Sequence, residues 1–86
     1  MPYCIEYTDS ANDDMSRLDR VVAHQVRNKL DELAGRAETV RHRALTGPLR
    51  GQYRLRVGNY RVLYELDRTN RRITVRAVGH RSEIYY

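Results

Sequence analysis

The alternation of apolar and polar residues predicts a short strand close to the start of the chain. Tyr3, Ile5 and Tyr7 lie on one side of an extended segment, and Cys4 and Glu6 lie on the other. A period of two is typical of a strand that has one covered face. The segment PYCIEYT is therefore predicted to be a strand.

Beyond this strand the apolar positions recur every three or four residues, which is the spacing of helices with one buried stripe. The polar run 8–10 offers helix caps, and Ser10 with Asp13 has the spacing of a weak capping box. The stripe changes phase at residues 19–21, and Gly35 is a stop signal. Two helices are predicted, separated near residues 19–21 and ending at about residue 36, with these apolar positions: Ala11, Met15, Leu18, Val22, Val26, Leu30, Leu33 and Ala37.

The second half of the chain predicts three strands, over residues 52–57, 60–67 and 72–79. The basic segment 37–51 shows no period and contains a Gly-Pro break, so it is predicted to be a loop. Gly58-Asn59 is a two-residue connection that suits a tight hairpin turn. We therefore expect a single α+β domain of 86 residues, with an N-terminal strand and two helices packed on one face of a three- to four-stranded antiparallel sheet.

The tight hairpin predicts a register that separates apolar side chains from arginines. If Val57 faces Tyr60, then Arg56 faces Arg61. The apolar face, suited to cover by the helices, holds Tyr53, Leu55, Val57, Tyr60, Val62, Tyr64 and Leu66. The other face holds Arg54, Arg56 and Arg61.

The last strand is predicted to extend the arginine face. Matching its apolar residues Ile73, Val75 and Ala77 to the apolar face requires Tyr60 to face Gly79. The residues that then join the arginine face are Arg76, Val78 and His80, with Arg81 beside Arg61.

Charge is distributed unevenly along the chain. Residues 1–35 hold four basic and seven acidic side chains, a net −3, whereas residues 36–86 hold twelve and four, a net +8. A one-sided positive field attracts phosphate-rich partners through counterion release and steering. The competing interpretation is a basic but otherwise ordinary protein surface.

The facing arginines indicate an anionic partner. Like charges directly opposite each other destabilise a sheet by roughly a few tenths of a kcal/mol, so stability alone would not select Arg56 opposite Arg61. Fifteen of the sixteen basic residues are arginine, whose planar fork binds phosphate in pairs. The alternative is a solvated face, with arginine stems over apolar neighbours or ion pairs with Glu65 or Glu83.

Cysteine content and hydropathy predict a protein of a reducing compartment, the cytoplasm. Cys4 is the only cysteine, so neither an internal disulfide nor a Cys/His zinc set can form. The N-terminus lacks the order of basic and apolar residues found in signal peptides, and no apolar run approaches the roughly 20 residues of a membrane span. We expect no metal, no cofactor and no membrane association.

The segment LRGQYRLRVGNYRVLYELD, followed by ITVRAVGHRSEIY, resembles the RelE/ParE toxin superfamily, and more closely its RelE branch of ribosome-dependent messenger-RNA endoribonucleases. The resemblance covers nearly the whole chain, and the GNYR hairpin and the GHRSEIY end are its specific parts. It implies the toxin of a type II toxin-antitoxin system, with a protein antitoxin, the ribosome and mRNA as partners.

In the RelE branch the working residues are basic side chains on the open sheet face and a C-terminal tyrosine. Carried over by motif, the catalytic positions are Arg56, Arg61, Arg81 and Tyr85. The RNA-binding positions implied by motif are Arg50 and Arg54, to which the predicted arginine face adds His80 and Arg76. The alternation of faces independently selects Arg54, Arg56, Arg61 and Arg81.

The chemistry implied by the resemblance is metal-free cleavage, in which the RNA 2′-hydroxyl attacks the adjacent phosphorus and a 5′-hydroxyl departs. The step needs charge neutralisation on the phosphoryl oxygens, a base for the 2′-hydroxyl and an acid for the leaving oxygen. Arg61 and Arg54 are assigned to the phosphate clamp and Arg81 to the leaving group. Tyr85, with Tyr86 as a second candidate, is assigned to stacking on or orienting a nucleotide.

Arg56 occupies the presumed base position, where the family pattern has lysine. Arginine does not lose its proton near neutral pH. Either Arg56 acts electrostatically while the ribosome aligns the RNA, or His80, held neutral by neighbouring arginines, is the base. Two other functions stay open, namely a gyrase-inhibiting toxin of the ParE branch and a catalytically weak RNA- or antitoxin-binding module.

Overall fold

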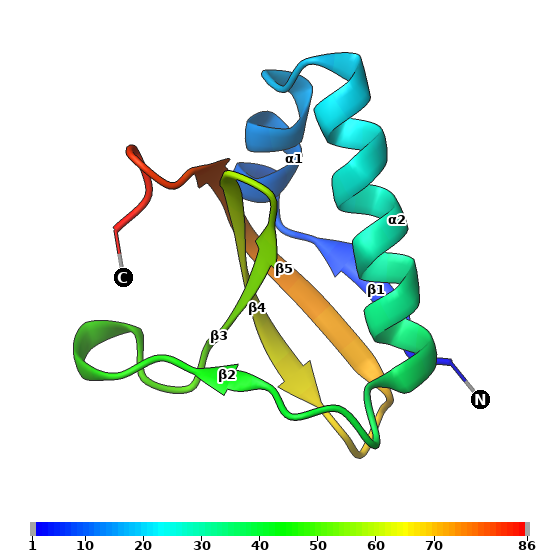
Figure 1. Cartoon of the computed structure of the whole chain (residues 1–86). Coiled ribbons are helices and arrows are strands. Elements are labelled where there is room, and N and C mark those ends of the chain that lie inside the picture. Colours follow the sequence, from blue (N-terminus) through cyan, green and yellow to red (C-terminus); the bar gives the residue numbers. More distant parts are fainter. Residues whose placement is uncertain (1, 86) are drawn as a thin grey trace.

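The structure is a computed structural model that describes residues 2–85. A strand and two helices come first, and most of the sheet follows from the second half of the chain (Figure 1). The elements are β1 Cys4–Tyr7, α1 Asp9–Ser16, α2 Arg20–Arg36, β2 Arg43–Ala44, the 3₁₀ turn η1 Gly47–Leu49, β3 Tyr53–Val57, β4 Tyr60–Asp67 and β5 Arg72–His80.

The strands form one mixed sheet in the order β1-β5-β4-β3-β2. β1 runs parallel to β5, and every other neighbouring pair is antiparallel. Both helices lie on one face of the sheet, whereas the C-terminal tail and the segment around η1 extend on the other side (Figure 1). The predicted α+β fold is confirmed, and the sheet has five strands rather than three or four.

One strand, β2, lies in segment 37–51, where the sequence predicts a loop. Its two residues pair with β3, so that Arg43 faces Arg54 and Ala44 faces Tyr53. A strand of two residues is too short to show an alternating pattern. Its existence is decided by the tertiary pairing with β3 and not by a local signal.

Helix α1 begins at a threonine cap. Thr8 Oγ1 accepts a hydrogen bond from the backbone N–H of Ala11 at 3.1 Å. This bond satisfies one of the N–H groups that have no partner within the first turn of a helix. The predicted capping box of Ser10 and Asp13 is therefore wrong, because the helix has already begun at Asp9.

Helix α2 covers the sheet and ends where the sequence predicts, for a different reason. The two helices separate at residues 17–19, close to the predicted break. α2 continues through Gly35 to Arg36, and its C-cap Ala37 has right-handed backbone geometry, so Gly35 is not the stop signal. Across residues 2–85, no helix combines the length and apolar character needed to cross a membrane.

The core fills the space between the helices and the sheet. The predicted apolar face is confirmed, since Val57, Val62 and Tyr64 are buried there and Tyr53 and Leu55 pack against them. Each large apolar side chain buried in this way contributes about 1.5–3 kcal/mol. The largest fully buried side chains are Tyr64, Leu30, Ile73, Val26, Val62 and Val75.

A histidine joins the segment after α2 to this core. His42 Nε2 lies 2.8 Å from the carbonyl of Ala37, which can only accept, so Nε2 carries the proton. His42 Nδ1 then accepts from the hydroxyl of Tyr64 at 2.5 Å. Burial raises the pKa of Tyr64 far above its ordinary value, so the phenol remains a donor. Tyr53 stacks on Tyr64 with ring centroids 5.6 Å apart.

Replacing Tyr64 with phenylalanine is expected to lower the free energy of unfolding by about 1–3 kcal/mol, because His42 Nδ1 loses its donor in a partly buried site. Urea denaturation at neutral pH measures the change. Tyr53→Phe, which removes the neighbouring phenol hydroxyl, is the matched control. A Tyr64→Phe protein with the wild-type urea midpoint would show that the bond does not stabilise the fold.

A β-bulge interrupts the pairing of β4 with β5. Leu63 faces Ala77, but the next residue of β4, Tyr64, faces Val75, which leaves Arg76 as an extra residue on β5. Because side chains alternate along a strand, one extra residue moves everything beyond it to the opposite face.

The predicted register at the far end of β5 is wrong for this reason. Tyr60 faces His80, and Gly79 instead faces Arg61. Val78 consequently points into the core, where its side chain is 5% exposed, and it does not join the arginine face.

Candidate functional site

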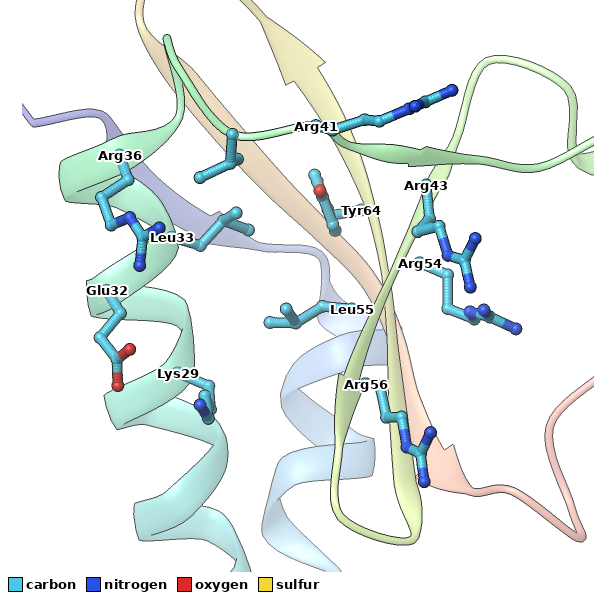
Figure 2. A pocket seen from close by; sticks show the side chains of 11 residues that line it. Lys29, Glu32, Leu33, Arg36, Arg41, Arg43, Arg54, Leu55, Arg56 and Tyr64 are labelled. Carbon is cyan, nitrogen blue, oxygen red and sulfur yellow. The ribbon is translucent and has the colours of Figure 1, made fainter.

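The side of the sheet away from α1 and α2, called the open face below, carries arginines from three neighbouring strands. Arg43 faces Arg54 across β2 and β3, and Arg56 faces Arg61 across β3 and β4, as the hairpin register predicts for the latter pair. Figure 2 shows the side chains of Arg43, Arg54 and Arg56 extending away from α2, whereas Leu55 points towards it. Alternation along β3 thus separates the cations from the core.

Arg61 is held against the β3–β4 turn. Its side chain is only 8% exposed, and Nη1 donates to the carbonyls of Gly58 at 3.0 Å and Tyr60 at 2.9 Å. Gly58 makes this turn possible because its φ of 58° is a left-handed conformation that other residues adopt at a cost. The hydrogen bonds to the turn also explain how Arg61 tolerates Arg56 opposite it. Its buried Nε has no hydrogen-bond partner within residues 2–85.

The tail after β5 is bonded to the same turn. The backbone N–H of Arg81 donates to the carbonyl of Asn59 at 2.8 Å. In the sequence, Asn59 lies between Gly58 and Tyr60, whose carbonyls accept from Arg61. The guanidinium group of Arg81 is on an exposed residue, and Tyr85 is 87% exposed. The turn therefore brings together Arg56, Arg61 and Arg81, three of the four predicted catalytic residues. The second stacking candidate, Tyr86, lies outside the described residues.

An isoleucine seats this tail on the open face. The backbone N–H of Ile84 donates to the carbonyl of His80 at 3.1 Å, and that of Glu83 does so at 2.9 Å. Ile84 Cβ lies 3.5 Å from the point where a Cβ atom on Gly79 would be. Gly79, which faces Arg61 across β4 and β5, therefore leaves the space into which Ile84 packs.

Replacing Gly79 with leucine is expected to displace the tail, because a large side chain needs the space that Ile84 occupies. Amide hydrogen exchange of Arg81 and Ile84 should accelerate by about tenfold or more, as for a loss of about 1.4 kcal/mol of local stability. Gly79→Ala is the control, since a single Cβ would meet Ile84 at an ordinary van der Waals distance. Unchanged exchange in the leucine variant would contradict this seating.

His80 is not part of the arginine face. It pairs with Tyr60, whose ring it contacts edge-on at a centroid distance of 5.3 Å. Its Nδ1 accepts from the backbone N–H of Ser82 at 3.2 Å, and Ser82 Oγ lies 2.7 Å from the same nitrogen. The predicted placement is wrong because the β-bulge moves His80 to the helix side, where it stabilises the start of the tail.

Two further predicted RNA-binding residues lie apart from the turn. Arg76, at the bulge, has Nη1 3.8 Å from a carboxylate oxygen of Glu65, the exposed ion pair that the sequence offers as an alternative. Arg50 follows η1 and is separated from Arg56 by most of the length of β3. The structure therefore does not bring Arg76 or Arg50 together with the arginines of the turn.

One basic residue of the open face is missing from the sequence predictions. Arg43 is placed beside Arg54 by β2, and the only sequence signal for it is its position in a basic segment. A groove of about 340 Å³ lies between α2 and β3, and Arg43, Arg54 and Arg56 are among the residues that line it (Figure 2). Leu33 and Leu55 form part of its apolar floor, and Arg36 lies on its helical rim.

Comparison with known proteins finds toxins of type II toxin-antitoxin systems by sequence. A family model described as the ParE toxin of the type II toxin-antitoxin system parDE matches residues 5–85. Toxin RelG of Mycobacterium tuberculosis is 31% identical over 86 residues, which cover 99% of this chain and 98% of that protein.

Solved structures of toxins share the fold. A chain in the crystal structure of the toxin-antitoxin complex RelBE2 from Mycobacterium tuberculosis has a TM-score of 0.83 and 26% identity, covering 93% of this chain and 99% of that chain. A variant of E. coli toxin RelE in the free state has a TM-score of 0.74 and 25% identity, covering 93% and 84%. The resemblance seen in the sequence is confirmed, and the chain belongs to the RelE/ParE superfamily of toxins from type II toxin-antitoxin systems.

Proposed function

We propose that this toxin is an endoribonuclease that cleaves mRNA at the ribosomal A site, through attack of the RNA 2′-hydroxyl on the adjacent phosphorus and without a metal. The observation that carries the proposal is that Arg56 faces Arg61 across the β3–β4 hairpin while the backbone of Arg81 is bonded to its turn. Guanidinium groups gathered on one surface suit a phosphodiester, whose negative charge increases in the transition state.

The surroundings of each arginine suggest a division of roles. Among residues 2–85, Arg81 is held through its backbone N–H, so its exposed guanidinium group can stabilise the departing 5′ oxygen by hydrogen bonding while that oxygen takes its proton from water. Arg56 is exposed and can bind a phosphoryl oxygen. Arg61 is engaged with the turn, so it contributes positive charge and fixes the hairpin instead of serving mainly as a clamp. Tyr85 is exposed enough to stack on a base.

The proposed mechanism has no side chain that takes the proton of the 2′-hydroxyl. Arg56 and Arg54, which stand where the family pattern has lysine, keep their protons at neutral pH. His80 is directed away from the open face. The proton of the 2′-hydroxyl then passes to solvent water as the bond from the 2′ oxygen to phosphorus forms and the bond to the 5′ oxygen breaks. The rate comes from alignment of the 2′-hydroxyl with phosphorus on the ribosome and from the charge of the arginines.

We further propose that a protein antitoxin binds this toxin and covers the open face. The similar RelBE2 chain is part of a toxin-antitoxin complex. Carboxylates of such a partner would pair with the open-face arginines and exclude RNA.

Mapping the 5′ ends of a message after adding the purified toxin to translating ribosomes tests the proposed cleavage. Cuts in phase with codons are expected, and they should be absent when the ribosomes are omitted. An intact message in the presence of actively translating ribosomes would refute the proposal.

A second function, inhibition of DNA gyrase, is favoured by the match to the ParE family model. The same preparation is therefore tested in a DNA supercoiling assay. Inhibited supercoiling with an uncut message would assign the toxin to the ParE type of activity.

A further inference from the structure

We propose that Arg43 and Arg54 form a second phosphate subsite, which holds the RNA phosphodiester next to the one that is cleaved. This inference rests on the proposed function, since it extends the RNA track beyond the β3–β4 turn. It assigns a binding role to Arg43, whose only sequence signal is its position in a basic segment.

The subsite is built by the short strand β2. Arg43 lies directly opposite Arg54 in an antiparallel pair, so both side chains leave the sheet on the open face. Figure 2 shows the two guanidinium groups next to each other, with Arg56 farther along β3. A pocket of about 280 Å³ lies at this pair, lined by Arg43, Ala44, Leu45, Thr46 and Arg54.

The loop that forms the pocket is tied to the sheet. The backbone N–H of Leu45 donates to the carbonyl of Gln52 at 2.9 Å, directly after the two residue pairs of β2 and β3. The backbone from Arg43 to Leu45 is therefore held against β3 before a ligand binds. A site held in this way loses less conformational entropy on binding.

The charges of the subsite favour an anion. Two arginines face each other at the edge of the sheet, and like charges directly opposite each other destabilise a sheet. Within residues 2–85 no carboxylate lies within 4.0 Å of the guanidinium nitrogens of Arg43. A phosphodiester that accepts from the planar fork of Arg43 beside Arg54 lowers the repulsion between these two facing cations.

The spacing of the arginine pairs suits neighbouring linkages of one strand. Arg54 and Arg56 are two residues apart on β3, so their pairs are separated by about 6.6 Å along the strand. Arg43–Arg54 and Arg56–Arg61 form two successive rungs across the open face. The first pair lies on the β2 side of β3 and the second on the β4 side, so an extended RNA strand that crosses β3 obliquely would place one phosphate at each pair.

The experiment compares Arg43→Ala with Arg27→Ala, which removes the same charge from an exposed position on α2, away from the open face. Cleavage by purified toxin on translating ribosomes is measured as a function of salt concentration. Arg43→Ala is expected to raise KM about tenfold with little change in kcat, as for one lost charge-assisted contact. The plot of log affinity against log salt concentration has a negative slope, and its magnitude should decrease by about 0.7 for Arg43→Ala alone.

The source of the phosphate is tested with messages that carry one neutral methylphosphonate linkage. If the message supplies the phosphate, neutralising the linkage beside the cleaved one should weaken wild-type binding and have no further effect on Arg43→Ala. If ribosomal RNA supplies it, the salt slope still falls but no message linkage shows coupling to Arg43.

The proposal is overturned if Arg43→Ala and Arg27→Ala have the same KM and salt slope. It is also overturned if Arg43→Ala weakens binding of the antitoxin only, since the ligand would then be a protein carboxylate. These results are separate from a failure of the proposed function. A wild-type toxin that never cuts RNA refutes the nuclease, whereas salt-dependent binding of the two variants to ribosomes still decides the subsite.

Discussion

Replacing Arg81 with alanine is expected to lower kcat for RNA cleavage by about 10²–10³-fold, the usual effect of removing one donor that stabilises charge in a transition state. The guanidinium group of Arg81 lies on an exposed residue, and the residue is held at the turn by its backbone N–H, which alanine retains. The fold should therefore survive the change, with a urea midpoint close to that of the wild type. Single-turnover cleavage on programmed ribosomes measures the loss of activity.

Two variants make the Arg81 test specific. Arg27→Ala removes an equal charge from α2 and should keep wild-type activity. Arg81→Lys keeps the charge but not the planar fork, and an intermediate rate is expected. If Arg81→Ala cleaves within about threefold of the wild type, a difference below 1 kcal/mol, Arg81 does not act on the leaving group.

Replacing Arg61 with alanine is expected to impair both activity and stability. Its Nη1 binds the carbonyls of Gly58 and Tyr60, and the side chain is 8% exposed. Loss of these charged hydrogen bonds should lower the free energy of unfolding by about 1–3 kcal/mol. A turn that is no longer fixed would also misplace Arg81, so kcat should fall by about 10²-fold or more.

Arg56→Ala is the matched control for Arg61, because it removes the other member of the same cross-strand pair. Arg56 is exposed, and its loss relieves repulsion, so the free energy of unfolding should stay constant or rise by roughly a few tenths of a kcal/mol. Urea denaturation of both variants decides the question. Equal stabilities of Arg61→Ala and Arg56→Ala would mean that the hydrogen bonds of Arg61 to the turn do not stabilise the fold.

Arg81→Ala is expected to change kcat only, whereas Arg61→Ala is expected to change both kcat and the free energy of unfolding. This difference matters for interpreting toxicity assays. A growth assay reports only whether the toxin acts, so it cannot separate a lost transition-state contact from a displaced turn. Measuring kcat together with the free energy of unfolding separates the two causes.

Local signals predicted the hairpin that carries the candidate site. A two-residue turn fixes the register of the hairpin. Placing Val57 opposite Tyr60 therefore determines every other residue pair of β3 and β4. The alternation of side chains then places Arg54, Arg56 and Arg61 on the face opposite the core. Local signals also predicted the two helices, because their apolar stripes are long enough to show a period.

Local signals failed where two alternatives look alike in the sequence. Val75, Ala77 and Val78 are all small or medium apolar residues, so either of two alternations along β5 places an apolar set on the core side. The structure combines the two through the extra residue Arg76. This choice moves His80 to the helix side, and it depends on how β5 packs against the helices and β4, which no local window contains.

Local patterns predicted both helices, the strands β1, β3, β4 and β5, the hairpin register and the side of the sheet on which the arginines of β3 and β4 lie. Contacts between distant segments place Arg43 beside Arg54, seat the tail at Gly79 and form the bulge at Arg76. The physical reason is the range of the interactions. Period and turn chemistry act within a few residues, whereas strand pairing at an edge, a bulge and a docked tail depend on contacts between segments far apart in the chain.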